Sequence, residues 1–420
     1  MTKLRILMVS DFESAGGAAI GASRLAAGLC EAGHDVVRVV AHPGTEGSWR
    51  RIQVDELRLL PARLRLGWIS LPWRLQQRYR AKLVRKRVRE VVASEKPDVI
   101  SVHNLHGGGP GWDWELVEIC CQAAPVVWTL HDTWSFTGRC AYPMDCRKFV
   151  DGCDEKCPTA DEYPKLPRNQ IAAAWRGRTE MLSRQPGLVA VTPSRWLAGQ
   201  ALAGMWQGHR VETIPNGMDQ SVYERIDRGL ARQALGLTSD GPVLLSGAHS
   251  LAAQWKGVAL LGEALDRLSN GRFHLVTFGL SGGGGERLAD WHTHLGFIDY
   301  DRARALAYCA ADLFVHPSLA DNLPQTIAES LACGTPVVAL PVGGVPEMVA
   351  PGETGWLARE ATAEALADTL RLALHQLRDG LDLRERCRQF AEKNYNLQTR
   401  AARYEALFGS LIDSRKNTRC

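Results

Sequence analysis

The 420-residue chain contains no uninterrupted run of about eighteen apolar residues, the length that a membrane-spanning helix requires. Its first apolar run, in MTKLRILMVSDF, stops at Asp11 and is followed by no cleavage-site pattern, so we predict a β-strand there and not a signal peptide. The composition also lacks the charge excess of disordered chains, because 45% of the residues are apolar and 23% are charged. These absences favour a globular, cytoplasmic protein that is long enough for two domains.

The cysteines lack the even number and the regular spacing of a secreted disulfide framework. Eleven are present, several of them inside apolar segments, which fits a reducing cytoplasm. Cys140, Cys146, Cys153 and Cys157 lie in a loop rich in Gly, Asp and Pro, spanning residues 140–157, without paired CxxC spacing. Four cysteines this close together could hold one structural zinc ion that staples a loop with little core of its own. Free thiols and disulfides are the alternatives.

Positive charge is concentrated in one segment, although the net charge is only +4. Leu57 to Arg89 contains eleven Lys or Arg and no acid, with Trp68, Leu71, Trp73 and Leu75 among them. Cations interleaved with Trp and Leu suit an anionic lipid surface, so we expect residues 57–92 to contact a membrane peripherally. The alternative is a solvated charged helix face. There is no second basic stripe, so we expect no nucleic-acid partner.

The order of apolar segments predicts two α/β domains in series. A strand at 5–10, a helix at 18–32 and a strand at 36–41 form a βαβ unit, with Gly16 and Gly17 before the helix. A phosphate could approach the backbone there, although any strand-to-helix turn also favours glycine. We place the first domain at 1–215, a polar, glycine-punctuated linker at 216–240, the second domain at 241–393, and a helix with a tail at 394–420.

Polar residues follow two strands of the first domain. The strand at 97–102 ends at His103-Asn104, and the strand at 126–130 ends at His131-Asp132. Ligands bind at the carboxyl edge of a parallel sheet, so His131 is a candidate for substrate contact. A structural histidine in a loop is the alternative.

In the second domain, residues 312–347 read as strand, helix, strand and helix. Asp321, Asn322 and Pro324 precede a helix at 325–333, a strand follows at 336–340, and a further helix is expected to start near Pro346. Two helix N-termini at one sheet edge would bind an anion. The glycine-rich stretch 279–285 lacks G-x-G-x-x-G spacing, so we predict a flexible loop and no dinucleotide site.

Together these segments resemble the retaining family 4 glycosyltransferases of GT-B fold, and especially enzymes of bacterial surface-polysaccharide assembly, whose members often carry a similar cysteine loop. The resemblance covers most of the chain in the right order. Its motifs are Ser14-x-Gly16-Gly17-Ala18, Leu130-His131-Asp132-x-Trp134-x-Phe136-x-Gly138-x-Cys140, Thr192-Pro193-Ser194, Ile214-Pro215-Asn216-Gly217-x-Asp219, Lys256-Gly257, and Pro317-Ser318 through DNLPQTIAESLACGTPVVALPVGGVPE.

The resemblance implies two Rossmann-like domains facing a cleft, with the last helix crossing back onto the N-terminal domain. It also implies a donor site in the C-terminal domain, in which Glu329 holds the nucleotide ribose and Asp321, in place of the usual Glu, lies near the donor sugar. Lys256 would contact the donor phosphates. The helix start, formed by Asn322, Leu323, Pro324, Gln325 and Thr326, would offer the backbone N–H groups of its four residues other than proline. The arginine with which the family commonly pairs this lysine has no counterpart between Ser246 and Lys256.

The resemblance therefore predicts a retaining hexosyltransferase that uses a UDP-, GDP- or dTDP-sugar, with His131, Lys256, Asp321 and Glu329 as its catalytic residues. No catalytic cofactor is expected, since no Asp-x-Asp motif lies where a catalytic metal would be needed. The acceptor would be a saccharide or lipid-linked saccharide at the inner face of the plasma membrane. The alternatives are a non-catalytic sugar-nucleotide-binding protein and a GT-B epimerase or phosphorylase.

Overall fold

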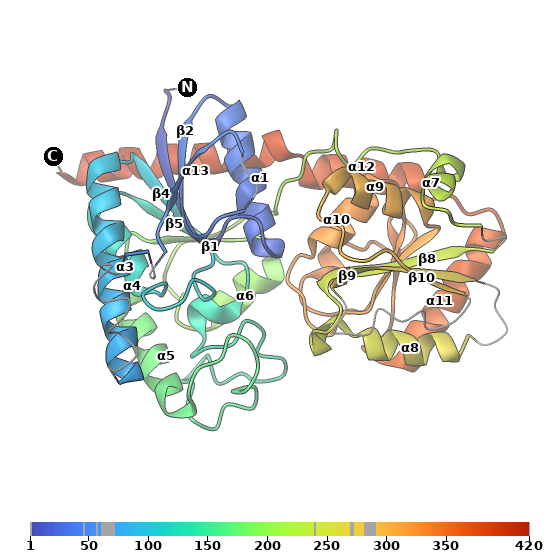
Figure 1. Ribbon diagram of the computed structural model, residues 1–420, viewed down its shortest axis with the longest axis horizontal. Coiled ribbons are helices and arrows are strands. Elements are labelled where there is room, and N and C mark those ends of the chain that lie inside the picture. The colour runs from blue at the N-terminus through green and yellow to red at the C-terminus, as the bar shows by residue number, and fades with distance from the viewer. Residues whose placement is uncertain are drawn as a thin grey trace. The chain divides into compact units, whose positions relative to one another are not determined.

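The computed structural model describes residues 2–44, 47–55, 58–59, 72–238, 241–268, 273–280 and 291–419 (Figure 1). The chain divides into two compact units, each built on its own sheet. Unit 1 comprises Met1–Gly217 together with Gln398–Cys420, and unit 2 comprises Met218–Leu397.

Unit 1 contains a seven-stranded sheet in the order β3-β2-β1-β4-β5-β6-β7, with every neighbouring pair parallel. Most of these strands are uninterrupted apolar runs because both faces of the sheet are covered by helices. The strands are β1 (Arg5–Phe12), β2 (Asp35–His42), β3 (Arg50–Gln53), β4 (Val99–Val102), β5 (Val126–Thr129), β6 (Val189–Thr192) and β7 (Val211–Thr213).

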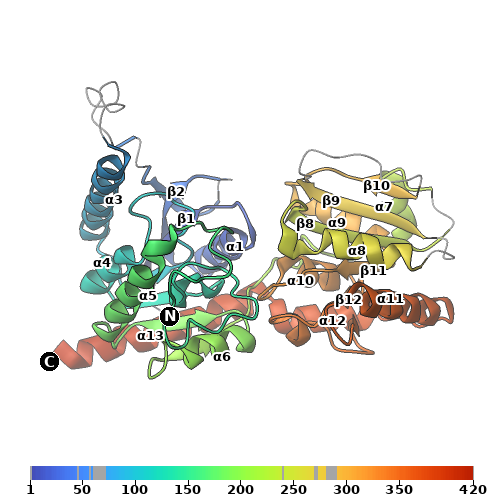
Figure 2. The ribbon, with the colours of Figure 1, turned by 90° about the horizontal axis from the view of Figure 1, so that it is seen from below.

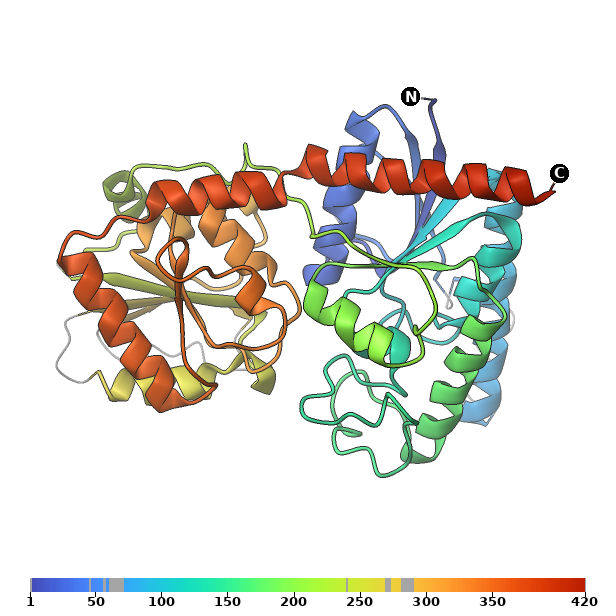
Figure 3. The same ribbon diagram turned by 180° about the vertical axis from the view of Figure 1, so that it is seen from behind.

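Two hydrophobic cores lie on the two faces of this sheet. On one face, side chains of β1 pack with helices α1 (Gly17–Glu31) and α13 (Leu397–Arg419), through residues such as Leu25 and Phe408. The red α13 runs beside this part of unit 1 in Figure 3. The other face packs against α3 (Trp73–Glu95), α4 (Glu115–Ala123), α5 (Arg168–Ser183) and α6 (Arg195–Ala203). Helices α3 and α4 lie against each other, as Figure 2 shows. The short η2 (Thr133–Phe136) follows β5.

Unit 2 contains a six-stranded parallel sheet in the order β10-β9-β8-β11-β12-β13. Helices α7, α9, α10 and α12 lie on one side of it and α8 and α11 on the other (Figure 1). The strands are β8 (Val243–Ser250), β9 (His274–Leu280), β10 (His292–His294), β11 (Leu313–His316), β12 (Val337–Ala339) and β13 (Gly355–Leu357). The helices are α7 (Arg228–Ala234), η3 (Gln254–Lys256), α8 (Val258–Asp266), α9 (Asp301–Ala310), α10 (Gln325–Ala332), η4 (Val345–Glu347), α11 (Ala363–Arg378) and α12 (Arg384–Tyr395).

The fold class is confirmed, because both units are Rossmann-like parallel sheets and a C-terminal helix returns to unit 1. Three details differ from the prediction. The segment predicted as a linker, 216–240, belongs to unit 2 from Met218 onward, and its Tyr223 is fully buried in that core. The helix expected near Pro346 is only the three-residue η4. The returning helix is preceded by α12, and the two helices are separated by Asn396.

The basic segment predicted at 57–92 is described mainly as α3, and its residues Trp68 and Leu71 lie outside the described part of the chain. The described start of α3 exposes large apolar side chains, with Trp73 67% and Leu75 51% exposed. Its second half instead buries Val84, Val88 and Val91 in unit 1. None of the described helices is long and apolar enough to cross a membrane.

Candidate functional site

The carboxyl edge of the unit 2 sheet brings Lys256 and Asp321 together. Lys256 ends η3, which follows β8, and Asp321 lies in the loop after β11, the neighbouring strand in the sheet. The Lys256 Nζ donates a hydrogen bond to Asp321 Oδ2 at 2.6 Å. His316, the last residue of β11, lies with its Nε2 3.5 Å from the same oxygen. Two of the four residues that the sequence suggested as catalytic therefore form one ion pair.

The charge of Lys256, and not contact with water, stabilises the ionised form of Asp321 in this cluster. Burial raises the pKa of the Asp321 carboxyl, but the charge of Lys256 and the contact with His316 outweigh burial, so that the pKa lies well below its ordinary value. Burial lowers the pKa of His316, more than its contact with Asp321 raises it. The cluster at neutral pH is thus a buried carboxylate, a cation and a neutral imidazole.

Two glycines allow this loop geometry. Gly257 has φ +67°, and a Cβ there would lie 1.9 Å from the carbonyl oxygen of Pro317. Gly343 has φ +55°, and a Cβ there would lie 1.8 Å from the carbonyl oxygen of Asp321. Any larger residue would push the loops that carry Lys256 and Asp321 apart, since backbone atoms cannot yield as a side chain can.

The start of α10 adds backbone donors at the same edge. Asn322, Leu323 and Pro324 are buried, whereas Gln325 and Thr326, the first helical residues, are partly exposed. Pro324 occupies the N-cap position, and no side chain caps the helix there. The first N–H groups of α10 therefore suit a negatively charged ligand.

Glu329 belongs to a second buried cluster. The Tyr308 hydroxyl donates to Glu329 Oε2 at 3.1 Å, and Arg304 Nε lies 3.9 Å from that oxygen. Burial raises the pKa of Tyr308, and the adjacent Glu329 raises it further. Since Glu329 is only 2% exposed, its carboxylate is held inside unit 2, and the ribose role remains a prediction.

Arg304 is a cation that the sequence did not single out. It lies on α9 and donates to the Tyr223 hydroxyl at 3.1 Å. Burial lowers the pKa of His249, the second-last residue of β8, and the nearby Arg304 charge lowers it further, so Arg304 lies near the carboxyl end of β8. The spacing Asp301-x-x-Arg304-x-x-x-Tyr308 places these three side chains on one helix face, which is the only sequence signal for it.

In unit 1 the strand ends bring two histidines into contact. His131 Nε2 lies 3.0 Å from His103 Nδ1, and the rings are stacked with centroids 5.3 Å apart. His103 is anchored in turn by Ser101, at 3.2 Å. Burial lowers the pKa of His131 to about 4 and that of His103 well below its ordinary value, so both rings are neutral at pH 7.

A contact between an imidazole and a carboxylate lies beside these rings. His106 Nε2 lies 2.9 Å from Asp132 Oδ2, and Asp132 also accepts bonds from Asn104 Nδ2 at 3.1 Å and from the Trp134 N–H at 2.8 Å. Burial lowers the pKa of His106, but the Asp132 charge reverses this and leaves it raised. His106 was missed because it lies four residues beyond the end of its strand. It also contacts the exposed Tyr163, whose hydroxyl lies 3.1 Å from Nδ1.

Gly16 and Gly17 begin α1, as the sequence predicted. Gly16 is the N-cap, with φ +86°, a conformation that favours glycine. A Cβ at either position would meet nothing within 4 Å. The turn is therefore open on the side where a side chain would be, which leaves space for a ligand at this helix start.

The structure does not support a zinc ion in the cysteine loop. Across the described residues, no group of three or more His, Cys, Asp or Glu side chains is arranged to hold a metal ion. Burial raises the pKa of Cys140 to about 11 and that of Cys153 to about 12, which favours the thiol over the thiolate in both side chains. Cys153 accepts a bond from the Gly138 N–H at 3.2 Å, and Cys157 packs with Ala160 and Ile171. Cys146, like the other three cysteines of this loop, forms no disulfide.

Two buried arginines hold this loop instead. Arg139 donates to the carbonyl oxygens of Pro164 and Glu162, both at 2.8 Å, and also to Thr159. Arg178, on α5, donates to the carbonyl oxygens of Thr137 and Gly138, and its guanidinium lies 4.2 Å from the Trp134 ring centroid. Hydrogen bonds from these two guanidinium groups to backbone carbonyls thus hold the cysteine loop in place.

Sites at the carboxyl edges of two Rossmann-like sheets define a GT-B protein, and comparison with known families agrees. The family described as "Glycosyltransferase Family 4" matches residues 15–222 of this chain. The family described as "Glycosyl transferases group 1" matches residues 242–376. The two matches follow one another along most of the chain. The chain therefore belongs to the group 1/family 4 glycosyltransferases.

Two similar proteins illustrate the range of this family. WcaC of Escherichia coli K12, named as a colanic acid biosynthesis glycosyl transferase, is 28% identical over 60% of this chain and 62% of its own length. The D-inositol 3-phosphate glycosyltransferase of Actinosynnema mirum is 31% identical over 51% of this chain and 54% of its own length. The matched stretches thus span less than two thirds of these relatives.

Solved structures share the fold over nearly the whole chain. Sucrose-phosphate synthase of Thermosynechococcus elongatus superposes with a TM-score of 0.74, at 20% identity, covering 98% of this chain and all of the other. HepE of Anabaena, solved with UDP-glucose, superposes with a TM-score of 0.68, at 17% identity, over 97% of this chain and all of its own.

Proposed function

We propose that this protein is a retaining glycosyltransferase that moves a hexose from a nucleotide-diphosphate sugar to a lipid-linked or growing surface saccharide. The observation that carries the proposal is the Lys256–Asp321 ion pair beside the α10 N-terminus, at the carboxyl edge of the unit 2 sheet. The family matches support glycosyl transfer, and the UDP-glucose complex of HepE makes a UDP-sugar the first donor to test.

The pair positions a cation for the leaving nucleotide. An ammonium group has three donors, so Lys256 can keep its bond to Asp321 and still donate to a donor phosphate oxygen. The buried Asp321, only 7% exposed, fixes where that ammonium lies. Charge that develops on the diphosphate as the sugar departs would then meet Lys256 and the N–H groups of Gln325 and Thr326. Preorganised donors of this kind are usually the largest contribution to catalysis in such reactions.

Other residues are assigned by position. Glu329 would hold the ribose, and Arg304, through its place beside His249 and Glu329, would supply the second cation. In unit 1, His131 and the α1 start at Gly16 and Gly17 would contact the sugar and the acceptor. The retaining course rests on the family resemblance alone.

The acceptor side of the proposal rests on two observations. WcaC is named for the biosynthesis of colanic acid, and α3 begins with exposed Trp73 and Leu75 beside several Lys and Arg. Together they favour a cytoplasmic enzyme that contacts the inner membrane face peripherally, where a lipid-linked saccharide would be presented.

Purified full-length protein incubated with labelled UDP-, GDP- and dTDP-sugars and acceptor extracts tests the proposal. We expect transfer from one donor, with the anomeric configuration of the donor kept in the product as read by NMR. Folded protein that neither transfers nor hydrolyses any donor would refute enzymatic activity and leave a sugar-nucleotide-binding protein. Epimerisation of the donor without acceptor, or dependence on inorganic phosphate, would point to the other two alternatives.

A further inference from the structure

Unit 2 contains a cavity of about 790 Å³ at the edge of its sheet opposite to the donor site. Four of its lining residues directly precede four strands: Phe273 precedes β9, Pro242 precedes β8, Asp312 precedes β11 and Pro336 precedes β12. The cavity therefore lies at the amino ends of these parallel strands. Lys256 and Asp321 lie at the carboxyl ends, so this cavity is not part of the site described above.

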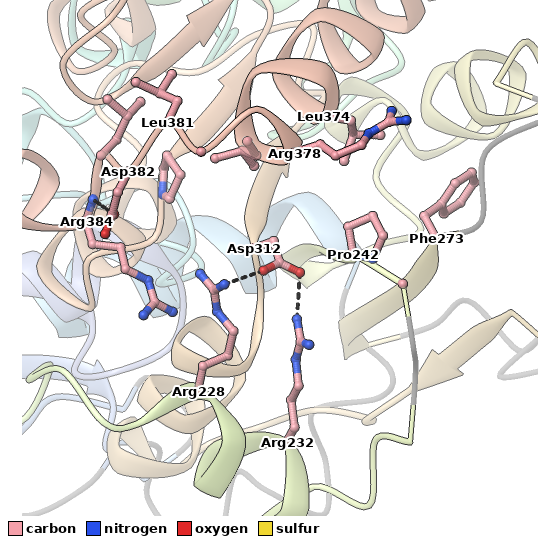
Figure 4. A pocket seen from close by; sticks show the side chains of 15 residues that line it. Arg228, Arg232, Pro242, Phe273, Asp312, Leu374, Arg378, Leu381, Asp382 and Arg384 are labelled. Carbon is pink, nitrogen blue, oxygen red and sulfur yellow. Dashed lines mark hydrogen bonds and ion pairs between the residues drawn. The ribbon is translucent and has the colours of Figure 1, made fainter.

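Positive charge gathers in the cavity wall. Arg228 and Arg232 come from α7, Arg378 ends α11 and Arg384 begins α12, whereas the acids in the wall are Asp312 and Asp382. Asp312 is already saturated, because its two oxygens bind Arg228 at 2.5 Å, Arg232 at 2.6 Å and the Val243 N–H at 2.7 Å. These contacts are drawn in Figure 4.

Cationic capacity remains after these pairings. The buried Nε of Arg228 has no hydrogen-bond partner, and no ion pair or hydrogen bond involves the Arg384 guanidinium within the described residues. Burial lowers the pKa of Arg228, and the nearby guanidinium groups of Arg384 and Arg232 lower it further. In Figure 4 the Arg384 side chain extends toward Arg228. The Asp382 carboxylate accepts a bond from the Arg384 backbone N–H at 2.9 Å.

The rest of the wall is apolar. Leu377 also lines the cavity, and Figure 4 shows Phe273, Leu374 and Pro242 in the part away from Arg384. A ligand that fits has an anionic head and an apolar or ring-shaped body. Guanidinium groups bind phosphate oxygens in a fork of parallel hydrogen bonds, which favours a phosphate head over a single carboxylate.

We propose that this cavity is a second ligand site, separate from the donor site, which binds a small phosphomonoester by its head between Arg228 and Arg384 and by its body against Phe273 and Leu374. The site does not depend on the proposed transfer reaction. Since the wall joins α7, α11, α12 and the sheet, a bound ligand would also stabilise unit 2 against unfolding.

Calorimetric titration of the full-length protein with phenyl phosphate tests this, with inorganic phosphate and phenol as the two halves of the probe. We expect phenyl phosphate to bind more tightly than either half. Arg384→Gln should weaken it at least about tenfold, the effect of one lost charge-assisted hydrogen bond. Arg386→Gln is the matched control, because Arg386 lies on the same helix and donates to the Gly352 carbonyl, away from the cavity wall.

Lys256→Ala separates the two sites, and we expect it to leave phenyl phosphate binding unchanged. No binding at millimolar ligand, equal binding by Arg384→Gln, or loss of binding in Lys256→Ala would each overturn the proposal.

A lipid phosphomonoester is the other source of the same head group, so flotation with phosphatidic acid vesicles is run in parallel. Binding that depends on Arg384 with vesicles alone, and not with phenyl phosphate, would refute a soluble ligand.

Discussion

The two units hold their polar groups at the carboxyl edges of their sheets by different means. In unit 2, Lys256 and Asp321 are opposite charges at 2.6 Å, and glycines bring the backbone loops around them into close contact. In unit 1, His103 and His131 are neutral rings in contact, and the glycines of the α1 turn face open space. The close backbone contacts in unit 2 fix its site for one chemical group, whereas the open α1 turn leaves the site in unit 1 more adaptable.

The largest effect is expected from Lys256→Ala. It removes a preorganised cation, so transfer should fall about 10²- to 10³-fold, as for other deletions of one transition-state donor. It also leaves the buried Asp321 carboxylate without its ion-pair partner, so stability should fall as well. Initial rates and thermal unfolding measure both effects. Lys393→Ala, on the exposed side of α12, is the control, and a Lys256→Ala enzyme with normal rates would remove this residue from the site.

The glycines test the difference in backbone packing between the loops of unit 2 and the α1 turn of unit 1. Gly343→Ala should destabilise unit 2 by about 2–3 kcal/mol, since its Cβ would overlap the Asp321 carbonyl and its φ is positive. Gly17→Ala in unit 1 should be neutral or slightly stabilising, because nothing lies within 4 Å and alanine favours helices. Urea unfolding of both variants measures the difference. Equal losses of stability would show that the two turns are not packed differently.

The histidines of unit 1 test whether their rings are neutral, in contrast to the ion pair of unit 2. The pKa of His131 is lowered from 6.5 to about 4 in the folded protein, so the unfolded chain takes up the proton first as the pH falls. Stability should therefore decrease by about 2 kcal/mol between pH 6.5 and 4, with the raised pKa of His106 opposing part of the loss. His131→Gln should flatten this dependence in urea unfolding followed by tryptophan fluorescence. An unchanged slope would assign it to other groups.

The cysteine loop should tolerate loss of a thiol. Cys146→Ser is expected to cost less than about 1 kcal/mol, because this partly exposed side chain forms no disulfide and, among the described residues, belongs to no group arranged to hold a metal ion. Metal analysis of the reduced wild-type protein should give well below one equivalent of zinc. Stoichiometric zinc that is lost in Cys146→Ser would restore the metal hypothesis.

The smallest effect is expected at the start of α3. Trp73→Ala should weaken binding to anionic vesicles about threefold, since one exposed aromatic side chain is lost and the cations remain. Tyr300→Ala, equally exposed but in unit 2, is the control in a co-sedimentation assay. Identical binding by both variants would argue against a membrane role for this part of unit 1.

The sequence predicted elements and sites unequally well, for physical reasons. Strands buried on both faces are unbroken apolar runs, so β1, β5 and β11 could be located closely. Lys256 and Asp321 were found as candidates because they match motif positions of the family that the chain resembles. Arg304 and His106 could not be found, since their neighbours Glu329 and Asp132 are distant in sequence. Zinc binding by the cysteine loop stays a prediction, since cysteine spacing shows how many thiols are present but not that Arg139 and Arg178 bind the loop carbonyls.

The return of α13 to unit 1 bears on attempts to prepare the units separately. The chain passes from one unit to the other at Gly217 and again at Leu397. A gene fragment ending at residue 217 would lack Phe408 from the α1 core and the Tyr404 hydroxyl, which lies 3.1 Å from Thr129 Oγ1. Residues 218–397 form one continuous piece. Unit 2 can therefore be expressed as a simple fragment, whereas unit 1 needs residues 398–420 rejoined by a designed connection.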